Sequence, residues 1–387
     1  ENVKTLSIED FLLLNADGDI ESLSEFLPRR SDTTEREKEL RCSALIKLLA
    51  NNEDVFFGHS TWDHLDMMGP RILKSYDFTK LEGMKGHKVV MSSSPGFVSS
   101  VDDFYVTNNG LVVMETTNGN YNKHLWNLVK PESVFSWVRS SVANSATTAH
   151  EWVELFSIQN SGTYNNQWMV FDTKMFIKGK ALSNNTFWVL EQLPGKIVAH
   201  DKSAELQSVS YWASYNVPYY DEIWRLSGFS MLMPRWMFSH KECPRAKIFH
   251  QRHQDIRNLT DFMYVMRYND YKNDPLARND ACNAISSRCD LNKVDGLFYR
   301  LSGGIDAKVT SIELAKKTNL LAQVGPTHDQ TPYFSWKKIQ PSKKFPKIPS
   351  HVGQSEEYRF GWEVFGTPSS IATFKVAPYQ LGLSIPA

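Results

Sequence analysis

The segment CSALIKLL, residues 42–49, begins a series of strand-like segments directly after a highly charged stretch. That stretch, RRSDTTEREKELR (residues 29–41), contains nine charged residues among thirteen. No side chains in it are spaced to form a buried face, so we predict an exposed linker of the kind that proteases cut. If the peptide bond before Cys42 were cut, the new terminus would carry a thiol nucleophile and an α-amine on one residue. The alternative for a free cysteine at the edge of a strand is a small, buried hydrophobic side chain.

A β-hairpin is predicted to begin at Cys42. The apolar segments 44–49 and 55–57 flank the turn-like sequence ANNED. If Leu49 and Val55 pair across this turn, the second strand returns beside Cys42 at the segment HSTW (59–62). A slip of one residue reverses which side chains share a face, so the pattern leaves open which of these four residues points at the thiol. His59 could equally be an ordinary histidine at the end of a strand.

Strand-like segments recur through much of the remaining chain. The sequence Asn108-Asn109-Gly110 predicts a tight turn between two of them. The segment SGGID (302–306) is predicted as a plain turn, and the chain after about Gln340 is expected to run over the surface. The predicted strands cover residues 87–91, 103–107, 111–117, 168–172, 186–192 and 196–200.

Helices are predicted at the N-terminal end and between the two groups of strands. The first thirty residues are expected to form two short helical pieces separated at Asp17-Gly18-Asp19. Pro131 begins a further helix, and residues 148–158 form its neighbour. The buried face of the helix after Pro131 is predicted to carry Val134, Trp137, Val138 and Val142. This order predicts an α+β protein whose sheets pack together with helices outside them.

Composition excludes several classes of partner. Apolar residues make up 41% of the 387 residues, enough for a sizeable core. Lys plus Arg equals Asp plus Glu at 43 each, which argues against a broad surface for polyanions, so no nucleic acid partner is expected. No apolar run approaches the roughly 18 residues that span a bilayer, so we predict no transmembrane anchor. The chain starts at Glu1 without a signal-like segment, as a mature product or a fragment would.

Motifs for metals and cofactors are not found in the sequence. It contains no C-x-x-C, no H-E-x-x-H and no G-x-x-x-x-G-K, so neither a metal site nor a cofactor is predicted. A papain-like site is disfavoured, because that class places its cysteine at the start of a helix and Cys42 begins a strand-like segment. Cys282 and Cys289 are close enough in sequence to close a short loop if oxidised. Two glycosylation sequons occur, at Asn184 and Asn258.

Longer strings in the chain resemble the phospholipase B-like family, which belongs to the N-terminal nucleophile hydrolases. CSALIK, followed by HSTW, resembles the start of the catalytic fragment in that family. The resemblance covers about residues 12 to 336, and GGIDAKVTS (303–311) is most similar to the lysosomal branch. The other matching strings are SSSPGF, DDFY, METTNGN (114–120), NSGTYNNQWMV (160–170), EQLPG, YWASYNVPYY (211–220), PRAKIF (244–249), MRYNDY with DP, and GPT with FSW.

The resemblance implies an αββα sandwich and an autocatalytic cleavage that exposes the nucleophile as a new N-terminus. Residues 1–28 would be the tail of an upstream fragment, 29–41 the processing segment and 42–387 the catalytic domain. Cys282 and Cys289 would form the counterpart of a disulfide in the lysosomal branch. The implied site residues are Cys42 as nucleophile, His59, Trp62 and Thr117 in the pocket beside it, Asn216 as oxyanion donor, and Arg245 as the pocket arginine.

The function implied by the resemblance is hydrolysis of acyl ester or amide bonds. The substrate would be a phospholipid or an N-acyl amide, and the missing upstream fragment of the same precursor would be a partner. The compartment would be lysosomal or secreted, with glycans at Asn184 and Asn258. The alternative is a glycosylated binding protein that keeps the fold without turnover.

Overall fold

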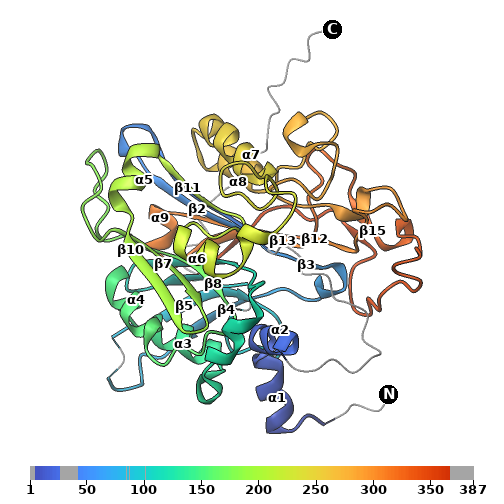
Figure 1. Ribbon diagram of the computed structural model, residues 1–387. Helices are drawn as coiled ribbons and strands as arrows, with labels where there is room; N and C mark the ends of the chain where they lie inside the picture. The colour runs from blue at the N-terminus through green and yellow to red at the C-terminus, as the bar shows by residue number, and fades with distance from the viewer. Residues whose placement is uncertain (1–4, 27–41, 84, 87, 101, 367–387) are drawn as a thin grey trace.

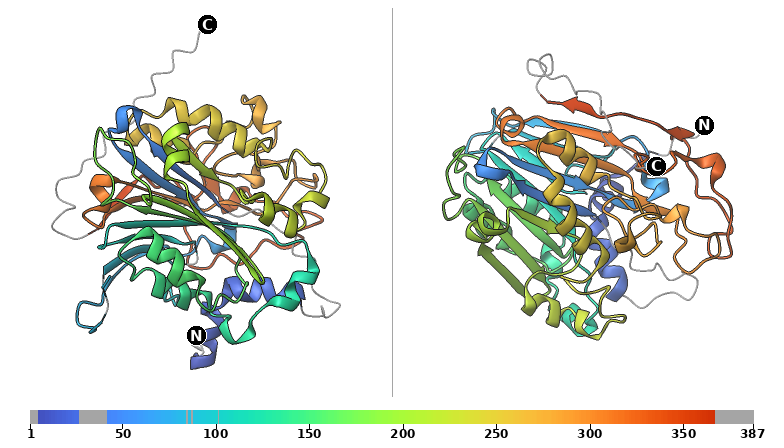
Figure 2. Two further views of the ribbon diagram at one scale, coloured as in Figure 1. Left: turned by 60° about the vertical axis from the view of Figure 1, so that its left-hand side comes forward. Right: turned by 90° about the horizontal axis from the view of Figure 1, so that it is seen from above.

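Two antiparallel sheets pack face to face in the computed structural model, which describes residues 5–26, 42–83, 85–86, 88–100 and 102–366. Helices cover the outer face of each sheet, so the layers follow the order helix, sheet, sheet, helix (Figure 1, Figure 2). The six-stranded sheet has the order β11 (Tyr211–Ser214), β1 (Ser43–Leu48), β2 (Val55–Ser60), β13 (Asp306–Ser311), β14 (Leu320–Val324), β17 (Glu363–Phe365). The seven-stranded sheet has the order β10 (Lys196–Asp201), β9 (Phe187–Leu193), β8 (Asn166–Asp172), β7 (Leu111–Thr117), β6 (Phe104–Thr107), β5 (Lys88–Ser93), β4 (Ile72–Asp77).

The helices divide between the two outer layers and one end of the sandwich. Helices α3 (Ser136–Ala143) and α4 (Ala149–Ser157) cover the seven-stranded sheet, and α7 (Pro244–Arg252) and α8 (Leu259–Met266) cover the other. The expected αββα sandwich is therefore confirmed. The remaining helices are α1 (Ile8–Asn15), α2 (Asp17–Phe26), α5 (Ser203–Val209), α6 (Asp221–Leu226) and α9 (Ile312–Ala315).

Strand β1 is apolar along its length because both of its faces are buried. Successive side chains of a strand point to opposite faces. Ala44, Ile46 and Leu48 accordingly join the core between the two sheets, whereas Leu45 joins the core beneath α7 and α8. Lys47 is buried as well, and its ammonium lies 3.0 Å from Ser210 Oγ. The layered structure thus follows directly from the alternation in CSALIKLL.

The predicted hairpin is confirmed, with a small shift in its register. Leu48, rather than Leu49, pairs with Val55, and Ser43 pairs with Ser60. The return strand therefore reaches Cys42 at the predicted segment. The turn at residues 108–110 is also confirmed, and Gly110 adopts a φ of 78°, which glycine tolerates without steric cost.

Three predicted features are wrong. The break between the N-terminal helices falls at Ala16, and Asp17–Asp19 lies inside α2. The buried face of α3 carries Ser136, Arg139, Ser140 and Ala143, while Val138 and Val142 are exposed. Helix α3 buries this polar face because it packs against α2 through hydrogen bonds. The carboxylate of Asp19 accepts them from the backbone N–H and the hydroxyl of Ser136, both at 2.9 Å.

The segment SGGID contains a strand instead of a plain turn. Its first three residues form β12 (Ser302–Gly304), which pairs with β3 (Trp62–His64). A Cβ at Gly303 would lie 2.4 Å from the carbonyl oxygen of Ser287, so the glycine permits a close approach of two backbones. The chain after Gln340 does not only cover the surface, because β17 completes an edge of the six-stranded sheet and β16 (Glu357–Tyr358) pairs with β15 (Phe334–Ser335).

The structure also tests the predicted disulfide and shows where the two glycosylation sequons lie. Cys282 and Cys289 form the expected disulfide. Asn184 and Asn258 are both exposed, and Asn258 caps the start of α8. Within the described ranges, no helix is long and apolar enough to cross a bilayer. The predicted processing segment 29–41 lies outside the described residues.

Candidate active site

Cys42 lies immediately before β1, in the space between the two sheets. Its side chain is buried, it is a free thiol, and its backbone has a φ of 65°. A β-carbon disfavours this left-handed conformation by roughly 1–2 kcal/mol. The surrounding contacts must therefore hold the residue in place.

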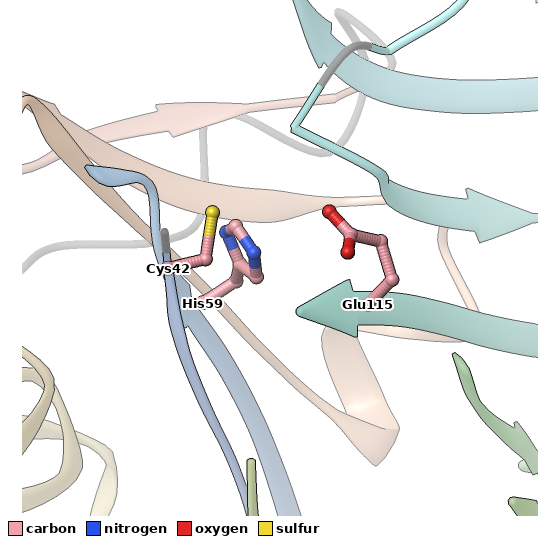
Figure 3. Close-up of side chains that lie close together, drawn as sticks. All are labelled: Cys42, His59 and Glu115. Carbon is pink, nitrogen blue, oxygen red and sulfur yellow. The ribbon is translucent and has the colours of Figure 1, made fainter. Parts of the chain in front are cut away.

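Two further side chains meet the thiol from different sheets. His59 extends from β2, and Glu115 extends from β7 of the opposite sheet (Figure 3). A sulfur, a ring nitrogen and a carboxylate oxygen of Cys42, His59 and Glu115 all lie within 4.8 Å of one another. Because His59 pairs with Ala44, it shares the face of the sheet that points toward the second sheet. The tertiary structure thus resolves which residue of HSTW points into the space beside the thiol.

The protonation states at this cluster follow from its burial. Burial raises the pKa of the Cys42 thiol well above its ordinary value, and the charge of Glu115 acts in the same direction. The backbone N–H of Trp62 donates to the sulfur and opposes this rise. Burial, with the charge of Lys308 acting in the same direction, lowers the pKa of His59 to about 3. The imidazole is therefore neutral. Neither ring nitrogen makes a hydrogen bond of good geometry among the described residues, although a contact with the backbone of Glu115 acts to raise the pKa of His59.

Arg245 joins three separate segments around Cys42. Its Nη1 donates to the carbonyl oxygen of Cys42 at 2.6 Å and to Ser43 Oγ at 3.2 Å. Its Nη2 donates to the carbonyl oxygen of Tyr215 at 2.7 Å and to Asn216 Oδ1 at 2.9 Å. The guanidinium also lies 4.2 Å from the centre of the Trp62 ring. Burial lowers the pKa of Arg245 to about 10, so the side chain remains charged at neutral pH.

Asn216 and Thr117 connect the two sheets on the same side of Cys42. The amide nitrogen of Asn216 donates to the carbonyl oxygen of Thr117 at 2.7 Å. Asn216 adopts a φ of 66°, a conformation that Asn tolerates better than most residues. The Asn216 amide carries a second N–H, and the structure assigns it no partner among the described residues. This group is the candidate donor to a developing oxyanion.

A narrow pocket opens onto the thiol. Cys42, Trp62 and Thr117 contribute to its lining, together with the apolar side chains of Met67 and Phe97. The other three predicted residues contact members of this lining: Arg245 contacts Cys42 and Trp62, Asn216 contacts Thr117, and His59 lies beside the thiol. The structure therefore brings all six predicted site residues together, although their roles in a reaction stay predictions.

A buried ion network beside the pocket was not predicted from the sequence. The ammonium of Lys308 bonds to Asp102 and, at 2.9 Å, to Asp306. Arg71 donates to the same two carboxylates at 2.7 and 3.0 Å. Although burial acts to raise it, the charges of Arg71 and Lys308 hold the pKa of Asp102 well below its ordinary value. Asp102, Asp306 and Lys308 lie in the matching strings DDFY and GGIDAKVTS, which were the only available signal, and Arg71 lies in neither string.

Glu115 was also missed, and it is connected to a second buried acid. Tyr164 Oη donates to Asp103 Oδ2 at 2.6 Å and lies 3.4 Å from Glu115 Oε1. Burial raises the pKa of Asp103 to about 7. METTNGN contains Glu115, but a single acidic residue in a buried strand carries no distinctive pattern. Among the described residues, Cys42, His59 and Glu115 are also close enough together to share a metal ion.

Comparison with known sequences shows that the chain is similar to phospholipase B-like proteins. The family model described as phospholipase B matches residues 1–365. Phospholipase B-like protein B of Dictyostelium discoideum is 39% identical over 378 residues, which cover 94% of this chain and 65% of that protein. A protein of Rattus norvegicus named "Putative phospholipase B-like 2" is 42% identical over 384 residues, or 93% of this chain and 64% of its own length. The chain thus spans slightly less than two thirds of the length of these relatives.

One solved structure shows a distant likeness. It is a mutant of conjugated bile acid hydrolase from Clostridium perfringens, with a TM-score of 0.39 and 11% sequence identity. The match covers 73% of this chain and 89% of that chain.

Proposed function

Because the chain belongs to the phospholipase B family, we propose that it is an acyl hydrolase whose nucleophile is the thiol of Cys42. In this proposal, cleavage of the bond between Arg41 and Cys42 first exposes the α-amine of Cys42. One observation carries the proposal: Arg245 holds the Cys42 carbonyl at 2.6 Å and the Asn216 amide at 2.9 Å beside a thiol that lines a pocket. Nucleophile and candidate oxyanion donor are thereby positioned by one side chain.

The proposed maturation begins with attack of the thiol on the carbonyl carbon of Arg41. The acyl group moves from nitrogen to sulfur, the thiol proton passes to the departing α-amine, and water then hydrolyses the thioester. The products are a carboxylate at Arg41 and a free thiol and amine at Cys42. The left-handed φ of Cys42 supports this step, because strain next to the cleaved bond is relieved when the bond breaks.

The proposed turnover uses the same atoms on an external substrate. The α-amine has an ordinary pKa of about 7.7–8.0 and accepts the thiol proton, directly or through water, as the sulfur attacks the acyl carbon. Asn216 Nδ2 donates to the oxyanion, and the leaving alcohol or amine takes up the proton. Water then hydrolyses the thioester and releases the fatty acid.

The proposed substrates are phospholipids or N-acyl amides. Trp62, Met67 and Phe97 give the narrow pocket an apolar side, against which the carbons next to an acyl group would pack. We assign the processing role to residues 29–41, between an upstream tail (1–28) and a catalytic domain (42–387). A lysosomal or secreted location, glycans at the exposed Asn184 and Asn258, and an upstream fragment as partner complete the proposal.

Intact mass spectrometry of the purified chain tests the maturation. We expect a species that begins at Cys42, and we expect Cys42→Ala to abolish it. Cys243→Ala is the matched control, since Cys243 is the other free, buried cysteine among the described residues, and this variant should still be cut. Cleavage that persists in Cys42→Ala would exclude a self-catalysed mechanism.

The cut protein should then hydrolyse members of a panel of phospholipids and N-acyl amides, assayed at acidic and neutral pH. Turnover should be lost in Cys42→Ala and retained in Cys243→Ala. An unchanged rate in Cys42→Ser would show that another residue is the nucleophile. Uncut chains without thiol-dependent turnover would instead support the binding protein.

A further inference from the structure

We propose that Cys42, His59 and Glu115 form a binding site for a borderline-soft divalent cation, with Zn²⁺ as the best match, and that the bound ion masks the thiol. The three residues combine one sulfur, one nitrogen and one oxygen donor, and Zn²⁺ accepts all three kinds. Binding of the ion does not depend on the proposed hydrolysis. Only the inhibitory consequence rests on the proposed function.

The donor atoms are already nearly close enough for a shared ion. They lie within 4.8 Å of one another, and two ligands of one tetrahedral zinc ion are about 3.5 Å apart, given bond lengths of about 2.0 to 2.3 Å. Small side-chain rotations of Cys42 and Glu115 close this difference, since they extend from facing sheets (Figure 3). Three protein ligands leave a fourth position for water, as in open zinc sites.

His59 is the observation that points most directly to a ligand. Its side chain is completely buried between the sheets, and neither ring nitrogen makes a hydrogen bond of good geometry among the described residues. A contact with the backbone of Glu115 can engage one ring nitrogen at most, which leaves the other without a partner. A buried polar group without a partner is rare, because it has given up its bonds to water. Burial also keeps the ring neutral, with a lone pair available, which is the form that binds metals. A cation beside Cys42 would supply the missing partner.

The charges around the site favour a cation when the thiol ionises. A thiolate at Cys42 would face the side chain of Glu115 in a buried space, and the negative charge of Glu115 opposes that ionisation. Two fixed cations act on Cys42: Lys308 is already paired with Asp102 and Asp306, and Arg245 donates to the carbonyl oxygen of Cys42. A divalent ion would be attracted to both the sulfur and the carboxylate. Its binding displaces the thiol proton to solvent and leaves no net redox change.

The ion has a route to this position. Cys42 and Glu115 both line the pocket that opens onto the thiol, while His59 lies behind them. Because the pocket is narrow, the ion must lose most of its bound water as it reaches the sulfur and the carboxylate, before the imidazole binds. Once bound, it occupies the sulfur lone pair that would attack an acyl carbon.

Cobalt substitution tests the site on the full chain, handled under an inert atmosphere without added reductant, so that the disulfide between Cys282 and Cys289 stays closed and offers no thiolate to Co²⁺. One equivalent of Co²⁺ should produce a thiolate-to-cobalt charge-transfer band, and Zn²⁺ should displace it. Cys42→Ser should abolish the band, and His59→Gln and Glu115→Gln should weaken cobalt binding by at least about 10-fold, the smallest loss expected for a metal-site residue. Cys243→Ser should leave both the band and the affinity unchanged.

A second measurement on the unaltered chain does not depend on how the variants fold. Zn²⁺ should protect Cys42, but not Cys243, against alkylation mapped by peptide mass spectrometry. A cobalt band that survives Cys42→Ser, or equal alkylation of Cys42 with and without Zn²⁺, would overturn the proposal.

The activity arm separates this inference from the proposed function. Equimolar Zn²⁺ should abolish hydrolysis by the cut chain, and a chelator should restore it. A chain that shows the Cys42-dependent cobalt band without any turnover would uphold the metal site and overturn the hydrolase. A chain with full turnover at saturating Zn²⁺ and no cobalt band would uphold the hydrolase and overturn the metal site.

Discussion

At the scale of single residues, the candidate site combines a thiol with surroundings that disfavour its ionisation. The thiol of Cys42 is buried, and burial together with the charge of Glu115 raises its pKa. A thiol with a raised pKa contains little thiolate and reacts slowly. A free α-ammonium on the same residue would place a positive charge beside the sulfur and lower that pKa. In the proposed reaction, the cut before Cys42 would therefore make the thiol more reactive toward an external substrate.

Replacement of Asn216 by glycine tests its role as oxyanion donor. Glycine keeps the left-handed backbone but removes the amide, so we expect kcat/KM to fall by about 10²- to 10³-fold. Activity assays on the cut variant provide the measurement. Asn51→Gly is the matched control, because Asn51 is exposed and also left-handed, with a φ of 55°, and this variant should retain activity. Equal activity of the two variants would exclude Asn216 as the donor.

Asp103 should give the stability of the protein a specific dependence on pH. Its folded pKa is raised to about 7, above its ordinary value of 3.8, so between these values the folded state binds a proton that the unfolded state lacks. Below about pH 3.8, the contribution of Asp103 to the free energy of unfolding is therefore complete. As the pH rises from there toward 7, this contribution falls by about 1.4 kcal/mol per pH unit. Asp103→Asn lacks this loss and should gain stability relative to the parent chain over that window.

Urea denaturation at several pH values measures the difference between the two chains. The difference in free energy of unfolding between Asp103→Asn and the parent chain should grow from acidic to neutral pH and then stay constant. Asp221→Asn, at an exposed carboxylate, should differ from the parent by a constant amount. A constant difference for Asp103→Asn would contradict the raised pKa.

At the scale of elements, α2 is anchored to the sandwich close to the site. The buried carboxylate of Asp19 accepts hydrogen bonds from Ser136 of α3 and from the hydroxyl of Thr163. One residue earlier, Gly18 packs against the ring of Tyr164, whose hydroxyl bonds to Asp103. The N-terminal helices thus contact the side of the molecule that carries the candidate site through two adjacent residues, Gly18 and Asp19.

Gly18→Ala should loosen this anchor. A Cβ at Gly18 would lie 2.2 Å from Cδ2 of Tyr164, so the ring or the helix must move. Overpacking of this kind costs about 1–3 kcal/mol and outweighs the gain of up to about 1 kcal/mol in helix propensity. We expect a lower unfolding temperature and faster hydrogen exchange in α1 and α2. Gly69→Ala, where nothing lies within 4 Å of the added carbon, should change neither.

At the scale of the whole molecule, the site depends on the packing of two sheets. Cys42 directly precedes β1 of the six-stranded sheet, His59 lies in β2 of the same sheet, and Glu115 lies in β7 of the seven-stranded sheet. The core between the sheets holds them at the separation that brings these side chains together. Phe57 of β2 and Phe171 of β8 meet there, with ring centres 5.0 Å apart. Loss of this core would separate the halves of the site.

Phe57→Ala should destabilise the whole fold. Its ring is fully buried, and such a truncation costs about 3–5 kcal/mol in the free energy of unfolding. Chemical denaturation followed by tryptophan fluorescence measures this change. Phe360→Ala, at a side chain that is 44% exposed, should cost less than about 1 kcal/mol. Similar losses in both variants would contradict the proposed role of the core.

Much of the local structure could be predicted from the sequence alone. The hairpin that returns HSTW to Cys42, the turn at residues 108–110 and the helix at residues 148–158 all follow from patterns within a few residues. Strand periodicity and turn chemistry act over that range, so each segment carries its own signal. Resemblance to a family supplied the six site residues, and the structure places them around one thiol.

Only the tertiary structure decided the features that join distant segments. The meeting of His59 with Glu115, the ion network around Lys308 and the exposure of Val138 depend on how sheets and helices pack. Such contacts leave no periodic signal, because partners far apart in the chain are selected together by burial and charge. The sequence by itself therefore determined a thiol at the start of a buried hairpin, and the packing of two sheets determined what surrounds it.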